Sequence, residues 1–404
     1  MTKLNKALMA STAIAFASGL ALPASAQDPS AAPGVVKSSN KVKLRLYGQI
    51  TRQFGFVSDD DATTFKQGPN GNTSTRMGID GRGKITKDIN LRTRFEFALN
   101  SGNSTGGPQF SNQPGANDFD IRHLDVIISH KQFGAVWIGR GDTATNGTSE
   151  INLAPGMNSG RLGGSTHHVA SEFRILDDAE AGEPSAVGTV DRFFGNFDGA
   201  GRQNRIRYDS PTLFGFKFGA SLIDKHNYDV ALRYSGQVLG TKIRGGVGFC
   251  STKGPSNAGD GSCFGNGGTV EGIEQVNGSM SLLTPIGVGV TMSGAKQWLN
   301  RSDAALSDNK TPFNLQPSVF YTTKVTELGA TTLEYAFQYT EDGSGGAAGA
   351  DGDKGYGHAV TLLQKVDSVG GDYFLGFRYF EVETATNDDV DPLWWVGAGF
   401  RQRF

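Results

Sequence analysis

A few short motifs in this sequence contain residue types that bind phosphate or metal ions in other proteins. The segment Gly78–Lys84 (GIDGRGK) has the spacing of a phosphate-binding loop, but Ile85 follows where Ser or Thr must hold Mg²⁺. The pair His167 and His168 has no third ligand at a recognisable spacing. No Ser/His/Asp set and no carboxylate pair has local support as a catalytic group. These motifs therefore predict no catalytic residue, no metal site, no cofactor and no enzyme.

Charged residues form two sets of opposite sign. The first set is basic, and its members recur at alternate positions of several short segments: Arg45, Arg76, Arg82, Lys84, Arg92, Arg94, Arg122, Arg205 and Arg207, offset by Asp80, Glu96 and Asp125. The second lies in the segment 141–202, which has nine acidic and four basic residues and so a net charge of −5. Two such sets can steer charged solutes only if both line the same passage. Their function therefore depends on where the secondary-structure elements place them.

The N-terminus has the features of an export signal. Two lysines precede the apolar run 7–22, and an Ala-Ser-Ala cleavage site ends at Ala26. Residues 1–26 are therefore predicted to be a signal peptide, followed by a short N-terminal segment, 27–41. A transmembrane anchor is the alternative, but the apolar part is short and no later run approaches the ~20 residues of a transmembrane helix. We expect an exported protein without a helical anchor.

The composition is that of a polar chain rich in glycine and aromatic residues. Hydrophobic residues make up 37% of the 404 residues, and there are 57 Gly and 26 Phe. Globular domains have ~45–50% in a count that also includes Gly. The net charge is −2, so no nucleic-acid partner is indicated.

From Val42 onward, apolar and polar residues alternate. Strict alternation predicts strands with one apolar and one polar face. About sixteen strands are predicted, at 42–56, 76–85, 91–99, 124–128, 136–138, 206–208, 216–222, 230–234, 243–249, 276–282, 288–292, 313–321, 333–339, 360–362, 373–379 and 394–404.

The connections alternate between tight turns and long polar loops. The tight turns are predicted at 87–90, 210–215, 284–287, 327–330 and 368–372. The long loops are 58–73, 100–119, the segment after Arg140, 251–270, 299–310, 341–355 and 383–391, with 223–229 as their one short member. This order is typical of an up-and-down barrel whose two rims meet different environments.

The polar faces contain Arg, Gln, Asn, Thr, Ser and Gly rather than the Lys and Glu of a wetted surface. The apolar faces carry aromatic residues near strand ends: Phe54, Phe56, Trp137, Tyr208, Trp298, Tyr321, Tyr339, Tyr379 and Trp394. This pattern indicates lipid outside, water inside and aromatic girdles between them. With the signal peptide, it predicts an all-β transmembrane antiparallel barrel, residues 42–404, in an outer membrane. A secreted all-β protein is the alternative.

Four stretches together resemble the general diffusion porins of Gram-negative bacteria, which are sixteen-stranded barrels that assemble as homotrimers. The stretches are Leu46–Ile50 (LYGQI), Arg122–Arg140 (RHLDVIISHKQFGAVWIGR), Arg205–Phe216 (RIRYDSPTLFGF) and Val396–Phe404 (VGAGFRQRF). The resemblance implies a homotrimer in a lipid bilayer beside lipopolysaccharide. It also implies that Phe404 and Phe400 belong to the signal that the barrel-assembly machinery reads.

The resemblance assigns a role to the two charged sets. The segment 141–202 follows the fifth strand, where the family has a loop that folds into the lumen and narrows the pore. Acid on this constriction loop and base on the wall would set a transverse field that sorts solutes by charge and dipole. In the alternative, the arginines only solvate the lumen and are neutralised there. The candidate basic residues are Arg45, Arg76, Arg82, Arg92, Arg94, Arg122, Arg205 and Arg207, and the candidate acidic residues are Glu150, Glu172, Asp177, Asp178, Glu180 and Glu183.

Three further features have no place in the pore. Cys250 and Cys263 are the only cysteines, and in an oxidising compartment they are predicted to form a disulfide within one external loop. Arg52 falls in the apolar row of the first strand, where facing lipid would cost about 2–4 kcal/mol, so it sits at the outer interface, a bulge or a subunit contact. The acidic runs 59–61 and 388–391 either bind divalent cations beside lipopolysaccharide or only keep the external loops solvated.

These observations predict a channel for passive diffusion of ions and small hydrophilic solutes across the outer membrane. A substrate-selective porin is the alternative: a denser Arg ladder would favour phosphate or other anions, and aromatic residues along the lumen would favour sugars. The lumen row is rich in Arg but only modestly aromatic, so neither preference is indicated. A barrel-anchored adhesin or enzyme is a further alternative; by the resemblance, the adhesion tripeptide Arg140–Asp142 lies at the root of the inward loop. An energy-coupled receptor is disfavoured because few residues precede the first strand.

Overall fold

The structure is a computed structural model that describes residues 35–37, 41–59, 63–68, 70, 73–100, 118–155, 174–177, 185–195, 197–253, 263, 270–301, 311–342, 352–384 and 390–404. The predicted signal peptide and most of the segment 27–41 lie outside these residues, as do His167 and His168. Among the described residues, no helix is long and apolar enough to cross a membrane.

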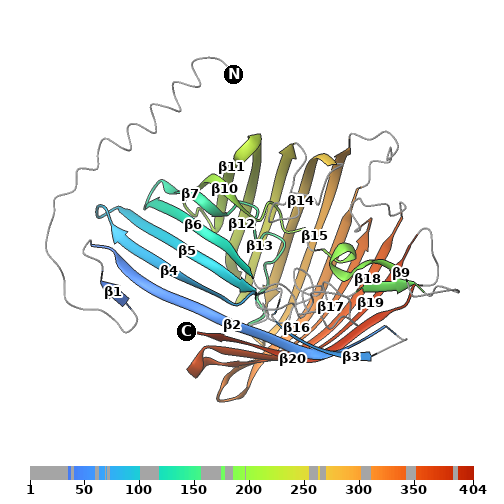
Figure 1. The fold of residues 1–404 in the computed structure, drawn as a ribbon. Coiled ribbons are helices and arrows are strands. Elements are labelled where there is room, and N and C mark those ends of the chain that lie inside the picture. Colours follow the sequence, from blue (N-terminus) through green and yellow to red (C-terminus); the bar gives the residue numbers. More distant parts are fainter. Residues whose placement is uncertain are drawn as a thin grey trace.

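Sixteen of the described strands close into one antiparallel barrel (Figure 1). Each pairs with the next along the chain, and the last pairs with the first from Gln49–Arg403 to Ser58–Trp394. The strands are β2 (Lys43–Ser58), β4 (Arg76–Lys84), β5 (Ile89–Asn100), β6 (Asp118–His130), β7 (Gly134–Asp142), β10 (Arg202–Asp209), β11 (Phe216–Ile223), β12 (Asn227–Val238), β13 (Thr241–Lys253), β14 (Val270–Leu283), β15 (Val288–Arg301), β16 (Phe313–Thr326), β17 (Gly329–Glu341), β18 (Lys354–Val366), β19 (Gly371–Glu383) and β20 (Leu393–Arg403). The prediction of an all-β barrel of about sixteen strands is confirmed.

The other described elements are short. Two strands extend the edges of β2 beyond its barrel neighbours, and two others pair only with each other. In that order these strands are β1 (Val35–Lys37), β3 (Thr63–Gly68), β8 (Arg174–Asp177) and β9 (Ser185–Thr189), and the helical turns are α2 (Val190–Phe193), η3 (Asp224–His226) and η5 (Asp367–Val369).

Strand alternation gives the barrel two different surfaces. On β2, Phe54 and Phe56 are 46% and 50% exposed, whereas their neighbours Thr51 and Gln53 are 0% and 3% exposed. The same contrast recurs around the barrel, so large apolar side chains cover the outside and mostly polar ones face the interior. We call these the outward row and the inward row. In a membrane the outward row meets lipid, and the closed ladder leaves no unpaired backbone edge there.

A β-bulge on β6 allows two residues at an odd spacing to face the same side of the strand. Both Arg122 and Asp125 are predicted to face inward, yet three positions separate them. The register of β5 and β6 shifts so that Glu96 pairs with His123 while Phe97 pairs with Ile121. Arg122 is the extra residue of this bulge, which lets both charged side chains face the interior.

The barrel interior contains an aromatic residue, Trp137, that was predicted from its residue type to lie outside. Trp137 was expected in an outer girdle, but its β-ladder neighbour Arg207 and its contacts place it in the inward row. The reason is parity: Val136 and Ile138 both face outward, so the residue between them must face inward. A buried apolar cluster also lies inside, between the segment that follows β9 and the inner faces of β16 and β18 to β20. The interior is therefore not uniformly polar.

The two rims differ as the sequence predicts. At one rim the described connections are short, such as the turn Leu239–Gly240, whose φ angles of 47° and 80° favour glycine. At the opposite rim lie the long loops, and η3 is the one short connection between described strands there. An up-and-down barrel with one short-turn rim results.

The C-terminus closes the barrel seam. Phe404 and Gly48 exchange two backbone hydrogen bonds of 3.1 Å, which extend the pairing of β20 with β2. A Cβ atom at Gly48 would lie only 2.3 Å from Cζ of Phe404, so the ring occupies the space that the glycine leaves free.

Candidate functional site

Strands β4 to β7, β10 and β11 carry several groups of ion-paired charged side chains, together called the basic wall below. Its members form ion pairs within and between strands: Arg76, Arg82, Arg92, Arg94, Arg122, Arg202, Arg205, Arg207 and Lys217 with Asp80, Glu96, Asp125, Asp142 and Asp209. Nine bases against five acids leave this wall a net charge of +4. Opposite charges therefore neutralise part, not all, of the wall.

One part of the basic wall presents positive charge to the lumen. Arg82 and Arg92 share the carboxylate of Asp80, at N···O distances of 3.0 and 2.7 Å. Their side chains are 64% and 38% exposed, whereas that of Asp80 is 5% exposed. Arg45 lies opposite Asp80 on β2 and is exposed as well. A solute in the lumen meets the guanidinium groups before it meets the carboxylate.

A second part surrounds Glu96 on β5. Its carboxylate accepts hydrogen bonds from Arg122 Nε and from the hydroxyl of Tyr47, both at 2.8 Å, and Arg76 lies 3.8 Å away. The side chains of Arg122 and Arg76 are 16% and 25% exposed. These two predicted pore residues therefore retain some contact with the lumen.

The third part is buried, which corrects the sequence prediction. Asp125 accepts a bidentate pair of hydrogen bonds from Arg94, at 2.9 and 2.6 Å, and a further one from Arg205 at 2.7 Å. The side chains of Arg94, Asp125 and Arg205 are 9%, 0% and 0% exposed. Arg207, paired with Asp209, is 9% exposed. These three arginines were predicted to line the pore, but they lie within the wall.

Glycines on β7 explain this burial. Gly139 and Gly141 occupy inward positions of β7, so no side chain separates Arg205 from the strand. Nη1 of Arg205 donates to the carbonyl oxygen of Gly139 at 2.6 Å, and a Cβ at Gly141 would lie 2.9 Å from Nη2 of the same arginine. The guanidinium therefore lies flat against the wall instead of extending into the lumen.

The described limbs of the segment 143–201, which joins β7 to β10, leave the barrel wall at β7 and contact strands between β11 and β19. The first limb, 143–155, bonds to inward side chains of β11, β14 and β17. Backbone N–H groups of Ala144, Ile151 and Leu153 donate to Ser221, Ser279 and Ser281 at 2.7, 2.9 and 3.0 Å, and the Asn152 amide donates to Glu334 at 3.0 Å. This limb therefore runs inside the barrel.

The return limb, 190–201, lies beside the first. Phe193 and Phe194 are buried in the apolar cluster, and Phe194 contacts Phe380 of β19 with ring centroids 4.9 Å apart. Gln338 and Gln275 donate to the carbonyl oxygens of Phe194 and Phe197 at 3.0 and 2.7 Å. Two adjacent phenylalanines in a polar segment were the available sequence signal for this contact.

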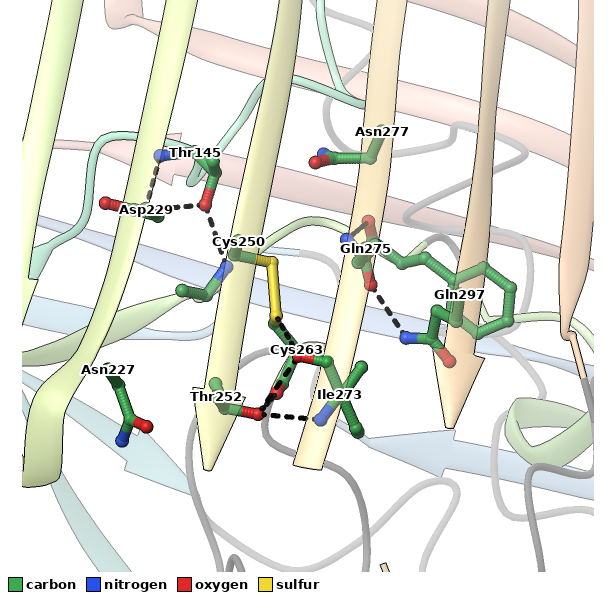
Figure 2. Close-up of a disulfide and its surroundings, with 12 residues drawn as sticks. Thr145, Asn227, Asp229, Cys250, Thr252, Cys263, Ile273, Gln275, Asn277 and Gln297 are labelled. Carbon is green, nitrogen blue, oxygen red and sulfur yellow. Dashed lines mark hydrogen bonds between the residues drawn. A yellow bond between two sulfur atoms is a disulfide. The ribbon is translucent and has the colours of Figure 1, made fainter. Parts of the chain in front are cut away.

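Asp229 on β12 is an anchor that the sequence analysis missed (Figure 2). Its fully buried carboxylate accepts from the backbone N–H of Thr145 at 2.7 Å and from the Thr145 hydroxyl at 2.6 Å. That hydroxyl oxygen accepts from the N–H of Ala200 at 2.9 Å, which ties the two limbs together. The signal was the parity of β12, where Tyr228 and Val230 alternate with Asp229.

The inferred membrane barrel can be compared with known proteins. A model of the Gram-negative porin family matches residues 10–400. The chain is a Gram-negative porin. It therefore forms a channel in the outer membrane through which solutes diffuse. No curated protein matches the chain.

Solved structures share the fold of this porin at low sequence identity. The anion-selective porin from Comamonas acidovorans is 13% identical, with a TM-score of 0.57 over 90% of this chain and 100% of that one. OmpT of Vibrio cholerae in its trimer form is 14% identical, with a TM-score of 0.55 and the same coverage. OmpF of Salmonella typhi in complex with daunomycin is 14% identical, with a TM-score of 0.51 over 90% and 98%.

The acidic residues of the porin's inward segment are described in part. Glu172, Asp178, Glu180 and Glu183 lie outside the described residues, and the side chain of Asp177 is not described. Glu150 lies near Asp198, whose carboxylate accepts from the N–H groups of Gly147 and Ser149 at 2.7 and 3.1 Å. Burial, and then the charge of Glu150, raise the pKa of Asp198 to about 8. Asp198 was not among the predicted pore residues.

The porin contains the disulfide between Cys250 and Cys263 (Figure 2). The prediction placed both residues in an external loop, but Cys250 is a fully buried residue of β13. The backbone N–H of Cys263 donates to the carbonyl oxygen of Gly199 at 3.0 Å, and the hydroxyl of Thr252 donates to that of Cys263 at 2.7 Å. The disulfide therefore holds residue 263 against the return limb, inside the barrel mouth.

Arg52, Phe400 and Phe404 lie in the outward row. Arg52 is partly exposed there and pairs in register with Phe400 of β20. Phe404 is 62% exposed. The parts of Phe404 and Phe400 in recognition by the assembly machinery stay predictions. Of the acidic runs, Asp59 is buried and Asp391 is described, while positions 60, 61, 388 and 389 lie outside the described residues.

Proposed function

We propose that this porin is a general diffusion channel whose constriction lies between the basic wall and the inward segment. The observation that carries this proposal is the path of the two limbs 143–155 and 190–201, which bond to β11, β12, β14, β16 and β17. The exposed arginines Arg82 and Arg92 stand on β4 and β5 of the wall that the segment leaves. A positive wall beside a segment of net charge −5 would set a field across the passage.

The test is the conductance of the refolded protein in a planar bilayer with a salt gradient across it. Stepwise openings with a non-zero reversal potential are expected, because a charged, water-filled passage conducts and selects ions. A folded barrel without conductance would contradict the proposal and favour the adhesin or enzyme alternatives. Loss of ligand binding after protease treatment of external loops would then identify an adhesin.

A preference for anions is the second candidate function. The observation in its favour is the exposure contrast at the basic wall, where Arg82 and Arg92 are 64% and 38% exposed but Asp80 is 5% exposed. Two unit charges about 4 Å apart in water interact with an energy of about 1 kcal/mol. The double variant Arg82→Gln/Arg92→Gln is therefore expected to lower the chloride-to-potassium permeability ratio about two- to fivefold.

The matched control removes a charge from the outward row. Lys296 on β15 is exposed there, so Lys296→Gln should leave the reversal potential unchanged. An unchanged ratio in the double arginine variant would contradict the anion preference while leaving the channel function intact.

We also propose that the porin assembles as a homotrimer and has no catalytic activity. Support for the trimer comes from the family resemblance and from the trimer form of OmpT, which has the same fold. Conductance steps in groups of three, together with a trimer mass in detergent, are the expected results. A monomer mass with single steps would contradict the trimer. Contacts with lipopolysaccharide and with the barrel-assembly machinery stay predictions.

A further inference from the structure

The buried part of the basic wall surrounds the indole ring of Trp137. The guanidinium carbons of Arg94, Arg205 and Arg207 lie 5.0, 5.9 and 4.8 Å from the ring centroid. Three like charges at such distances around one ring would repel each other without compensation. The negative faces of the indole and the carboxylates of Asp125 and Asp209 supply it.

Two of these arginines hold the backbone where the inward segment begins. Nε of Arg205 donates to the carbonyl oxygen of Asp142, the last residue of β7, at 3.0 Å. Nη1 of Arg207 donates to the carbonyl oxygens of Asp142 and Thr143 at 3.3 and 2.7 Å. These charge-assisted bonds fix the direction in which the chain leaves the barrel wall.

The nitrogen of the indole takes no part in this arrangement. Nε1 of Trp137 is buried and has no hydrogen-bond partner among the described residues. Burying a polar group without a partner is unfavourable, so the indole nitrogen does not explain the tryptophan at this position. Its contribution comes from the ring face, which contacts the guanidinium groups.

We propose that Trp137 is the positioning residue of the constriction: its ring holds Arg205 and Arg207 against the backbone of Asp142 and Thr143 and thereby sets the position of the inward segment. The inference rests on the channel function proposed above and adds the residue that controls it. Without the ring, the guanidinium groups lose their common partner and turn towards the lumen. The root of the segment is released, and the lumen gains exposed positive charge.

The experiment compares Trp137→Leu and Trp137→Phe with the wild-type protein in planar bilayers. Trp137→Leu is expected to raise the frequency of partial closures about tenfold, because cation–π contacts between buried groups are lost, and to shift the reversal potential towards greater anion preference. Trp137→Phe retains an aromatic face and should restore both readouts to near wild-type values. Trp298→Leu is the matched control, since Trp298 stands in the outward row of β15 and should change neither.

The outcomes separate this inference from the proposed function. A silent wild-type protein would contradict the channel function itself. If the wild type conducts and Trp137→Leu has the same current noise and ion selectivity as the wild type, the inference is overturned. A Trp137→Phe variant as noisy as Trp137→Leu would also overturn it, because the ring face would then not be the group that acts. If Trp137→Leu does not fold, Arg207→Gln replaces it. The inference then requires closures in Arg207→Gln and none in Trp137→Phe, and any other result overturns it.

Discussion

Burial divides the charged side chains inside this barrel by role. The exposed guanidinium groups of Arg82 and Arg92 contribute to the potential that a solute meets. The buried Asp125 instead accepts a hydrogen bond from the Arg205 side chain, and the buried Asp229 accepts one from the backbone N–H of Thr145. A buried charge is retained only where partners compensate its desolvation, so removing one partner costs more than removing an exposed charge.

Asp229 gives a prediction at this scale. In Asp229→Asn, an amide NH₂ group replaces one acceptor oxygen of the Thr145 site, so we expect a loss of about 1–3 kcal/mol in the free energy of unfolding and faster proteolysis within 143–155. Thermal unfolding in detergent and limited proteolysis measure the two effects. Asp224→Asn, at an exposed position of η3, is the control. Equal behaviour of both variants would show that Asp229 does not anchor the segment.

The raised pKa of Asp198 predicts a pH dependence. The carboxyl group is neutral well below pH 8 and ionised above it, so the inward segment gains one negative charge as the pH rises through about 8. Because the pKa in the folded state is raised, the associated stability is fully present below the unfolded value near 4 and is lost as the pH rises through 8. We expect cation preference to increase, and unfolding temperature to fall, between pH 6 and pH 9.

Reversal potentials and unfolding temperatures across this pH range measure the effect. Asp198→Asn should flatten both curves, because the titrating group is removed. A curve of unchanged slope in the variant would assign the pH dependence to another group.

At the scale of elements, the inward segment is held at several separate points. Its root is bonded by Arg205 and Arg207, its two limbs meet at Asp229, and its return limb is packed through Phe193 and Phe194. These attachments use charge-assisted bonds, neutral hydrogen bonds and apolar packing, respectively. The described limbs of the segment, 143–155 and 190–201, are therefore held against the folded wall.

The disulfide gives a prediction for the loop between β13 and β14. Cys250 and Cys263 are 13 positions apart. Closing a loop of about 15 residues lowers the conformational entropy of the unfolded chain, which stabilises the folded state by about 3 kcal/mol. We expect Cys250→Ser/Cys263→Ser to lower the free energy of unfolding by about 2–3 kcal/mol and to increase current noise, because Cys263 also bonds Gly199. Reductant should act on the wild type and have no further effect on the variant.

At the scale of the whole molecule, the barrel depends on pairing the two ends of the folded chain. β2 and β20 are far apart in sequence, yet their ladder closes the sheet and removes its edges (Figure 1). The Phe404 ring over Gly48 completes this seam. A chain that cannot close keeps unpaired backbone groups, which a bilayer does not tolerate.

Gly48 therefore gives a prediction for assembly. In Gly48→Val, the added Cβ would lie 2.3 Å from the Phe404 ring and 2.9 Å from the carbonyl oxygen of Arg76, so the seam must distort. Overpacking typically costs about 1–3 kcal/mol, and we expect a smaller folded fraction in a heat-modifiable gel-mobility assay. In the control Gly245→Ala, no atom lies closer than 3.3 Å to the added carbon. Equal folded fractions would contradict the importance of the seam.

The sequence by itself determined the barrel, because alternation is a local property of adjacent residues. Two-residue periodicity and the alternation of short and long connections predicted about sixteen strands in a closed barrel. The signal peptide and the pattern of apolar and polar faces predicted an outer membrane. The same reasoning placed most of the basic wall on the inward row. It failed where local parity conflicted with residue type, as it did for Trp137, which is aromatic but faces inward.

Only the tertiary structure decided which charges are exposed. From the sequence, Arg82 and Arg205 are equally good candidates for lining the pore. In the structure, β7 presents glycines beside Arg205, and the start of the inward segment covers it, so of the two only Arg82 is exposed. Likewise, the role of Asp229 depends on Thr145, which is 84 positions away in the sequence. Burial and pairing of a side chain depend on strands and segments brought together by closure of the barrel, and no local pattern records those neighbours.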